Sequence, residues 1–150
     1  MPKPFHFRLD KVLDYRRSLE DQATLALAKA KEAHVRQEQE VARMELLLKE
    51  HVERGFAPMG GGQANENDIW LWRQYKVALG QDLAQARETL ARLALKLQKC
   101  RQDALQRSKE RKVMEKLKEK QAVKHHEEES LKEQKEFDEM AAIRHGREDI

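Results

Sequence analysis

The chain has few of the residues on which a broad globular core or a disulfide framework depends. Aromatic side chains make up 5% of its 150 residues, and it contains three prolines and one cysteine. A single cysteine excludes an internal disulfide and is typical of a reducing compartment such as the cytoplasm. No apolar run is long enough for a transmembrane helix, and no apolar segment near the start resembles a secretory signal.

Charged residues are abundant instead, at 38% of the chain, and the mean hydropathy is −0.92. This composition favours a coiled coil or long helices over a compact domain, and disorder is the competing class. The segment 55–65, GFAPMGGGQAN, holds four of the six glycines and Pro58. Because both residue types disfavour helix, we predict an all-α fold, a long antiparallel two-helix coiled-coil hairpin with unequal arms. Residues 1–150 then form one domain, with helices over about 8–53 and 67–143 and a tip loop over 54–66.

Apolar residues recur at alternating steps of four and three in both arms, which is the period of a coiled-coil seam. In the first arm, eight of the thirteen seam positions are apolar. These thirteen are Leu9, Leu13, Arg16, Glu20, Ala23, Leu27, Ala30, His34, Gln37, Val41, Met44, Leu48 and His51. The second arm, capped by Asn67 or Asp68, has ten apolar positions among its first eleven. These eleven are Ile69, Trp72, Lys76, Leu79, Leu83, Ala86, Leu90, Leu93, Leu97, Cys100 and Ala104.

The seam of the second arm changes after Ala104. It continues through Arg107, Arg111, Met114 and Lys118, so its apolar character is lost near residue 114. Leu9 of the first arm faces about residue 112 in a hairpin with its tip near residue 60. We therefore expect an unpaired tail from about residue 114, where the first arm ends.

Two apolar groups lie beyond what a two-helix seam can bury. Near the tip, Trp70, Leu71, Trp72 and Tyr75 cannot all face the same partner helix, which makes them a candidate binding surface. In the tail, an apolar stripe is expected to be exposed. It consists of Phe137, Met140, Ala141 and Ile143.

No residue pattern predicts catalysis, a cofactor or a metal site. The glycines at 60–62 are not followed by the Lys-Ser/Thr of a phosphate-binding loop. His125 has usable helical spacing to Glu128 and Glu129, but a third and fourth ligand are missing. A two-helix hairpin also has no concave pocket in which the pKa of a side chain is easily shifted. We therefore expect a protein that is not an enzyme.

The two ends of the chain carry a family resemblance. The opening FHFRLDKVLDYRRSLEDQA and the closing KVMEKLKEKQ and EQKEFDEMAAIR are similar to the terminal blocks of the flagellar export protein FliJ family. The resemblance implies a coiled-coil stalk of the flagellar type III export apparatus, cytoplasmic and held at the cell membrane through its partners. Those partners are the hexameric export ATPase, the cytoplasmic domain of the membrane export gate and export chaperones. The stalk of the virulence injectisome shares this architecture.

The resemblance also implies two sets of binding residues. The family inserts both termini into the ATPase ring, and the corresponding set here is Arg8, Lys11, Arg16, Arg17, Gln134, Lys135, Phe137, Asp138, Glu139 and Arg144. The family binds the export gate near the hairpin tip, and the corresponding set is Leu48, Val52, Trp72, Tyr75 and Leu79.

Three alternatives to this interpretation remain open, and the first is a stalk homologue of the virulence injectisome. A generic scaffold or nucleic-acid-binding coiled coil could use residues 69–110, which carry nine basic and four acidic groups. Six basic side chains spread around this segment: Arg73, Lys76, Arg87, Arg92, Lys96 and Lys99. The last alternative is a coiled-coil dimer in which the seam packs between two chains.

Overall fold

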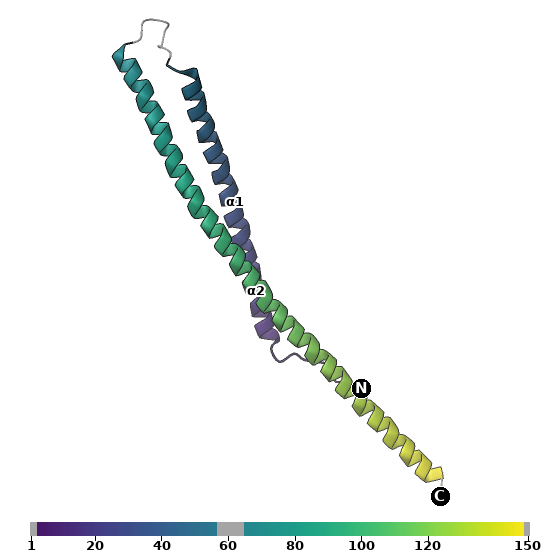
Figure 1. Ribbon diagram of the computed structural model, residues 1–150. Coiled ribbons are helices and arrows are strands. Elements are labelled where there is room, and N and C mark those ends of the chain that lie inside the picture. The colour runs from purple at the N-terminus through teal and green to yellow at the C-terminus, as the bar shows by residue number, and fades with distance from the viewer. Residues whose placement is uncertain (1–2, 57–64, 149–150) are drawn as a thin grey trace. The chain divides into compact units, whose positions relative to one another are not determined.

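The computed structural model describes residues 3–56 and 65–148, and nearly all of them lie in two α-helices (Figure 1). Helix α1 spans Asp10–Arg54 and helix α2 spans Glu66–Glu148, with lengths of 45 and 83 residues. The predicted all-α class with two long helices of unequal length is confirmed, whereas coiled-coil geometry stays a prediction. Helix α2 continues past the expected end near residue 143. Most of the expected tip loop, residues 57–64, lies outside the described residues.

The ends of both helices next to this loop have specific caps. Gly55 adopts a left-handed φ of 66°, and its N–H donates to the carbonyl oxygen of Val52 at 3.2 Å. This is the conformation in which glycine ends helices, because it has no Cβ to clash. At the start of α2, the Oδ1 atom of Asn65 accepts a 2.8 Å hydrogen bond from the N–H of Asp68. The prediction of a cap at Asn67 or Asp68 was therefore wrong, and Asn65 is the N-cap.

The described residues divide into two compact units, each built from a segment of α1 and a segment of α2. Unit 1 comprises Met1–Gln22 and Leu105–Ile150, and unit 2 comprises Ala23–Ala104. Among the described residues, neither helix has a stretch apolar enough to cross a bilayer. The two units bury different chemistry along the predicted seam, so each is described separately.

Unit 2 has an apolar core. Val41, Leu83 and Ala86 form a buried cluster, against which Met44, Leu48 and Leu90 pack. All predicted seam positions from Ala23 to His51 are buried or half-buried, as are those from Ile69 to Ala104 except the exposed Lys76. The polar seam residue Gln37 donates from Nε2 to the backbone oxygen of Ala86 at 3.0 Å. The 3.5-residue period therefore identified the face that is buried.

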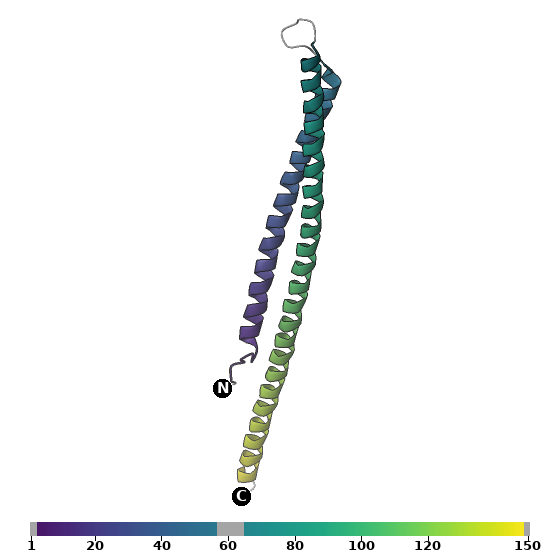
Figure 2. The same cartoon turned by 90° about the vertical axis from the view of Figure 1, so that its left-hand side faces the viewer.

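Unit 1 has a smaller apolar core and a longer region of pairing than the sequence predicts. Phe7 is 5% exposed and Leu13 is fully buried. Before α1 begins, residues 3–9 form a segment that contacts α2 as far along as His125. The expectation that α2 is unpaired from about residue 114 was therefore wrong, because this segment extends the contact. Helix α2 continues beyond the N-terminal segment in both views (Figure 1 and Figure 2).

Candidate interaction surfaces

The aromatic surface of unit 2 is organised around His51. Its ring stacks on Trp72 with centroids 4.9 Å apart and meets Tyr75 edge-on at 4.8 Å. The Nε2 atom of His51 lies 3.1 Å from the backbone oxygen of Trp72, which requires the ring to donate from Nε2. This contact joins the last turns of α1 to the first turns of α2 and fixes the orientation of both aromatic rings.

The five residues proposed to bind the export gate differ in how accessible they are. Tyr75 is 51% exposed and Val52 is 44% exposed, whereas Leu79 is 8% exposed and lies in the core. Leu48 is half-buried against the apolar cluster, and Trp72 is half-buried between its neighbours. A partner can therefore contact Val52 and Tyr75 directly. Leu79 is too buried for direct contact and supports the neighbouring surface from below.

Two other apolar side chains of the predicted aromatic surface are exposed, and one polar atom of Trp72 is unpaired. Trp70 and Leu71 are 56% and 52% exposed, as expected for aromatic and apolar groups that cannot all share one seam. The Nε1 atom of Trp72 is buried and has no hydrogen-bond partner among the described residues. Buried polar atoms are normally hydrogen-bonded, so this unpaired indole N–H is an exception among the described residues.

In unit 1, the N-terminal segment and the first residue of α1 are fastened to α2 by three contacts. The ring of Phe5 lies 5.6 Å from that of His125, and the Nε2 atom of His125 lies 2.9 Å from the backbone oxygen of Lys3. Close by, the Nζ atom of Lys118 lies 2.9 Å from the Oδ1 atom of Asp10. His125 is thereby occupied, and the described residues contain no group of three ligands able to hold a metal ion.

A layer of ion pairs replaces apolar packing along the seam of unit 1. Arg16 pairs with Glu110 at 2.8 Å, and Arg111 pairs with Glu20 at 2.6 Å. Arg111 also contacts Glu115 at 2.6 Å, and Arg107 contacts Glu110 at 3.4 Å, so the ion pairs extend into two clusters. Positions that interrupt the apolar seam in the sequence are therefore partners across the two helices.

These ion-pair clusters shift the pKa values of two of their members. The hydrogen bond from Gln106, followed by the charges of Arg16 and Arg107, lowers the pKa of the Glu110 carboxyl below its ordinary 4.5. The hydrogen bond to Glu20 is the main cause that raises the pKa of Arg111. Both shifts favour the charged forms, which is the expected effect of opposite charges in contact.

The residues proposed to bind the ATPase fall into three structural groups. Arg8 and Lys11 are exposed near the start of α1. Arg16 and Arg17 instead pair with Glu110 and Glu115 of α2, so a partner competes with these carboxylates for them. The third group lies on α2 beyond His125, and all of its side chains are exposed. It consists of Gln134, Lys135, Phe137, Asp138, Glu139 and Arg144.

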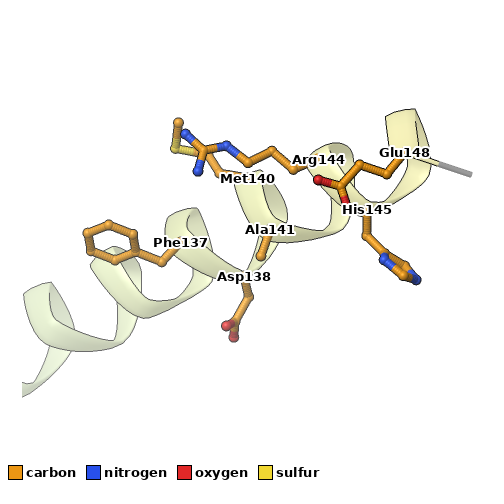
Figure 3. A pocket seen from close by; sticks show the side chains of 7 residues that line it. All are labelled: Phe137, Asp138, Met140, Ala141, Arg144, His145 and Glu148. Atoms are coloured by element: carbon orange, nitrogen blue, oxygen red, sulfur yellow. The ribbon is translucent and has the colours of Figure 1, made fainter.

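The exposed end of α2 carries a shallow hollow (Figure 3). Phe137, Met140 and Arg144 lie on one side of the helix, with Asp138 and His145 on the other. Phe137 is 71% exposed and Met140 is 57% exposed, so the helix presents apolar groups that nothing in the described chain covers. Ile143, expected in the same stripe, does not line the hollow, because six residues correspond to about 120° from Phe137 on a helix.

The alternative nucleic-acid surface over residues 69–110 is partly neutralised. Arg87 pairs with Glu45 at 3.0 Å, and Arg92 pairs with Glu88 at 2.9 Å. The phosphates of a nucleic acid would have to displace these carboxylates. The net charge of the segment is therefore larger than the positive charge that is free to contact phosphates.

Comparison with known proteins points to one family. The family model described as "Flagellar FliJ protein" matches residues 5–149. No curated protein and no solved structure matches the chain.

Proposed function

Because the chain belongs to the flagellar FliJ family, a family of components of the flagellar export apparatus, we propose that it is a non-enzymatic stalk with two binding ends. One end is the aromatic surface of unit 2, around Trp72 and Tyr75, and it binds the cytoplasmic domain of the export gate. The other end is in unit 1 and binds the ring of the export ATPase. The stalk thereby couples the ATPase to export, works at the cytoplasmic face of the membrane through its partners, and assists export chaperones.

The observation that carries this proposal is that each unit exposes its own apolar surface. In unit 2, exposed Tyr75 and Val52 adjoin the ordered stack of His51 and Trp72. In unit 1, exposed Phe137 and Met140 lie beyond the last contact between the N-terminal segment and α2. Uncovered apolar surface of this kind is typical of protein–protein contacts, and aromatic residues supply much of the binding energy there.

The residues that hold each surface suggest how binding is supported. His51 fixes the two aromatic rings before the gate arrives, which lowers the entropy that binding must overcome. At the other end, the exposed helix offers Phe137 as an apolar anchor beside Asp138 and Arg144. We expect it to enter a groove of the ring as an amphipathic helix. A moderate affinity suits this role, because a stalk locked to one state of the ring would stop turnover.

The test is a pair of separate binding measurements with the full-length protein, one with the cognate ATPase and one with the gate domain. Phe137→Asp should lose ATPase binding and keep gate binding, and Trp72→Ala should do the reverse. Matched controls are Leu131→Asp, at an exposed residue outside the hollow, and Val77→Ala, at an exposed residue outside the aromatic stack. Loss of both partners in one variant with unchanged helicity would show that the two ends are not separate.

A further inference from the structure

Five lysines lie on the face of α2 that points away from α1 in unit 1. The half-buried residues Arg111 and Lys118 contact Glu20 and Asp10 of α1 and so mark the inner face of α2. The lysines lie about 100° or more around the helix from Lys118, and all are exposed. They are Lys109, Lys112, Lys116, Lys120 and Lys124, and we call them the lysine face.

Two of the three carboxylates within residues 105–124 point inward, and the third, Glu119, is exposed beside the lysines. Glu110 is engaged by Arg16 and Arg107, and Glu115 by Arg17 and Arg111. In the described part of the chain, no carboxylate forms an ion pair with any of the five lysines. Residues 105–124 carry eight basic and three acidic groups, and the inward pairing leaves their excess positive charge on the outer surface.

Arginine and lysine occupy different faces of α2 in this segment. Arg107 and Arg111 lie on the seam and make directional contacts with carboxylates. Every lysine except Lys118 lies outside, on a flexible stem that carries a compact charge. Arginine favours fixed, forked partners, whereas lysine attracts anions without a defined geometry. This division suits a partner whose negative charges are diffuse and movable.

Apolar side chains are interleaved with the lysines. Leu105, Val113 and Val123 are 58%, 65% and 56% exposed on the same outer face. A nucleic acid gains nothing from exposed aliphatic groups, and residues 105–124 contain no aromatic residue on which bases could stack. A lipid headgroup layer accommodates both features, because aliphatic groups enter its boundary while lysine stems extend to the charged groups.

From this geometry we propose that the lysine face binds the surface of a membrane that contains anionic phospholipids. The five lysines extend over about 22 Å of helix, at roughly 1.5 Å per residue. The lysine face ends before Glu127. The segment 127–139 that follows contains seven acidic and two basic residues. The acidic segment is repelled by the same membrane, so contact is confined to residues 105–124. This direct lipid contact does not depend on the proposed binding of the gate or of the ATPase.

The test is sedimentation of the full-length protein with vesicles of pure phosphatidylcholine and with vesicles that contain 30% phosphatidylglycerol. Binding should require phosphatidylglycerol and should weaken strongly between 0.1 and 1 M salt, because the screening length falls from about 10 Å to about 3 Å. Each lysine near an anionic surface contributes about fivefold to partitioning. Changing all five lysines of the face to glutamine should therefore reduce binding by at least about 100-fold.

A matched variant separates the face from net charge alone. Changing Lys29, Lys31, Lys76, Lys96 and Lys99 to glutamine removes the same charge from exposed positions of unit 2, and it should retain most of the binding. Equal loss in both variants, or equal binding to pure phosphatidylcholine, would overturn the proposal. Tighter binding to a 25-base-pair DNA duplex, lost in the lysine-face variant, would assign the face to nucleic acid instead.

Two further measurements keep this result apart from the proposed function. Phe137→Asp, designed to lose the ATPase, should bind anionic vesicles as the wild type does. If the lysine-face variant kept vesicle binding but lost stimulation of the ATPase, the face would belong to the ring, and the lipid proposal would be wrong.

Discussion

The two units pair the same two helices with different chemistry. Unit 2 buries Val41, Leu83 and Ala86 in an apolar cluster. Unit 1 fills the corresponding seam positions with ion pairs such as Arg16–Glu110 and Arg111–Glu20, and it adds the N-terminal segment around Phe7. Apolar burial changes little with salt or pH. Partly exposed ion pairs are weakened by added salt and by a pH that neutralises one partner. The comparison predicts a robust unit 2 and a unit 1 whose pairing responds to its surroundings.

This difference suits the proposed roles. A surface for a gate needs rings in fixed positions, and Trp72 and Tyr75 are held by His51 on an apolar support. Unit 1 is proposed to enter the ATPase ring, which passes through several states. Helix pairing that can open locally would let unit 1 adapt to these states. Regions that move during function are generally of low local stability.

The largest effect is expected from a cavity in unit 2. Leu83 is 4% exposed, and Leu83→Ala should lower the free energy of unfolding by about 2–3 kcal/mol, because it removes buried methyl groups and leaves a gap. Urea unfolding followed by circular dichroism measures it. Leu95→Ala, at a residue 70% exposed, should change stability by less than about 0.5 kcal/mol. Equal losses in the two variants would remove the distinction between seam and surface.

A smaller, local effect is expected from the N-terminal segment of unit 1. Phe7→Ala should lower the opening free energy of this segment by about 2 kcal/mol, or about 30-fold in amide exchange rate, because it removes the buried ring. Exchange of the Asp10 amide, which donates to the Phe7 oxygen at 3.1 Å, reports it. Tyr15→Ala, at a residue 61% exposed, is the matched control and should leave this exchange unchanged. Exchange in unit 2 should stay as it was, and a change there would contradict local opening.

The smallest effect is expected from pH. The folded-state pKa of Glu110 lies below its ordinary 4.5. Its contribution to stability is therefore present above pH 4.5 and is lost as the pH falls through the lowered value. Amide exchange in residues 105–118, corrected for intrinsic rates, should accelerate between pH 5 and pH 3. Glu110→Gln should flatten that dependence, and an unchanged pH dependence in this variant would assign it to other carboxylates.

The sequence predicted the helices and their buried faces because both follow from local periodicity. The steps from Ala23 to Ala30, and from Leu83 to Ala86 and Leu97, place these side chains on one face whatever the partner. The same periodicity could not show that Arg16 and Glu20 have partners on α2, because it contains no information about side-chain direction across the seam. In the sequence, Arg16 and Glu20 therefore look like polar interruptions of the apolar seam.

The other differences come from contacts that no spacing encodes. The attachment of Lys3 and Phe5 to His125 joins positions 120 or more residues apart, and it extends the pairing beyond the expected tail. The cap at Asn65 depends on where the first helical turn closes, and three candidates lie within four residues. Among the candidate binding residues, Tyr75 and Phe137 are exposed whereas Leu79 is buried, and the spacing of the sequence alone did not show this difference.

In the proposed function, the exposed end of α2 acts on the export ATPase, whereas unit 2 does not. The most direct measurement is the ATP hydrolysis rate and hexamer content of the cognate ATPase with substoichiometric amounts of the full-length protein. The wild type and Trp72→Ala should raise both, whereas Phe137→Asp should raise neither. If the wild type changed neither quantity, or if Phe137→Asp stimulated as strongly as the wild type, the exposed end of α2 would not be the part that acts on the ATPase.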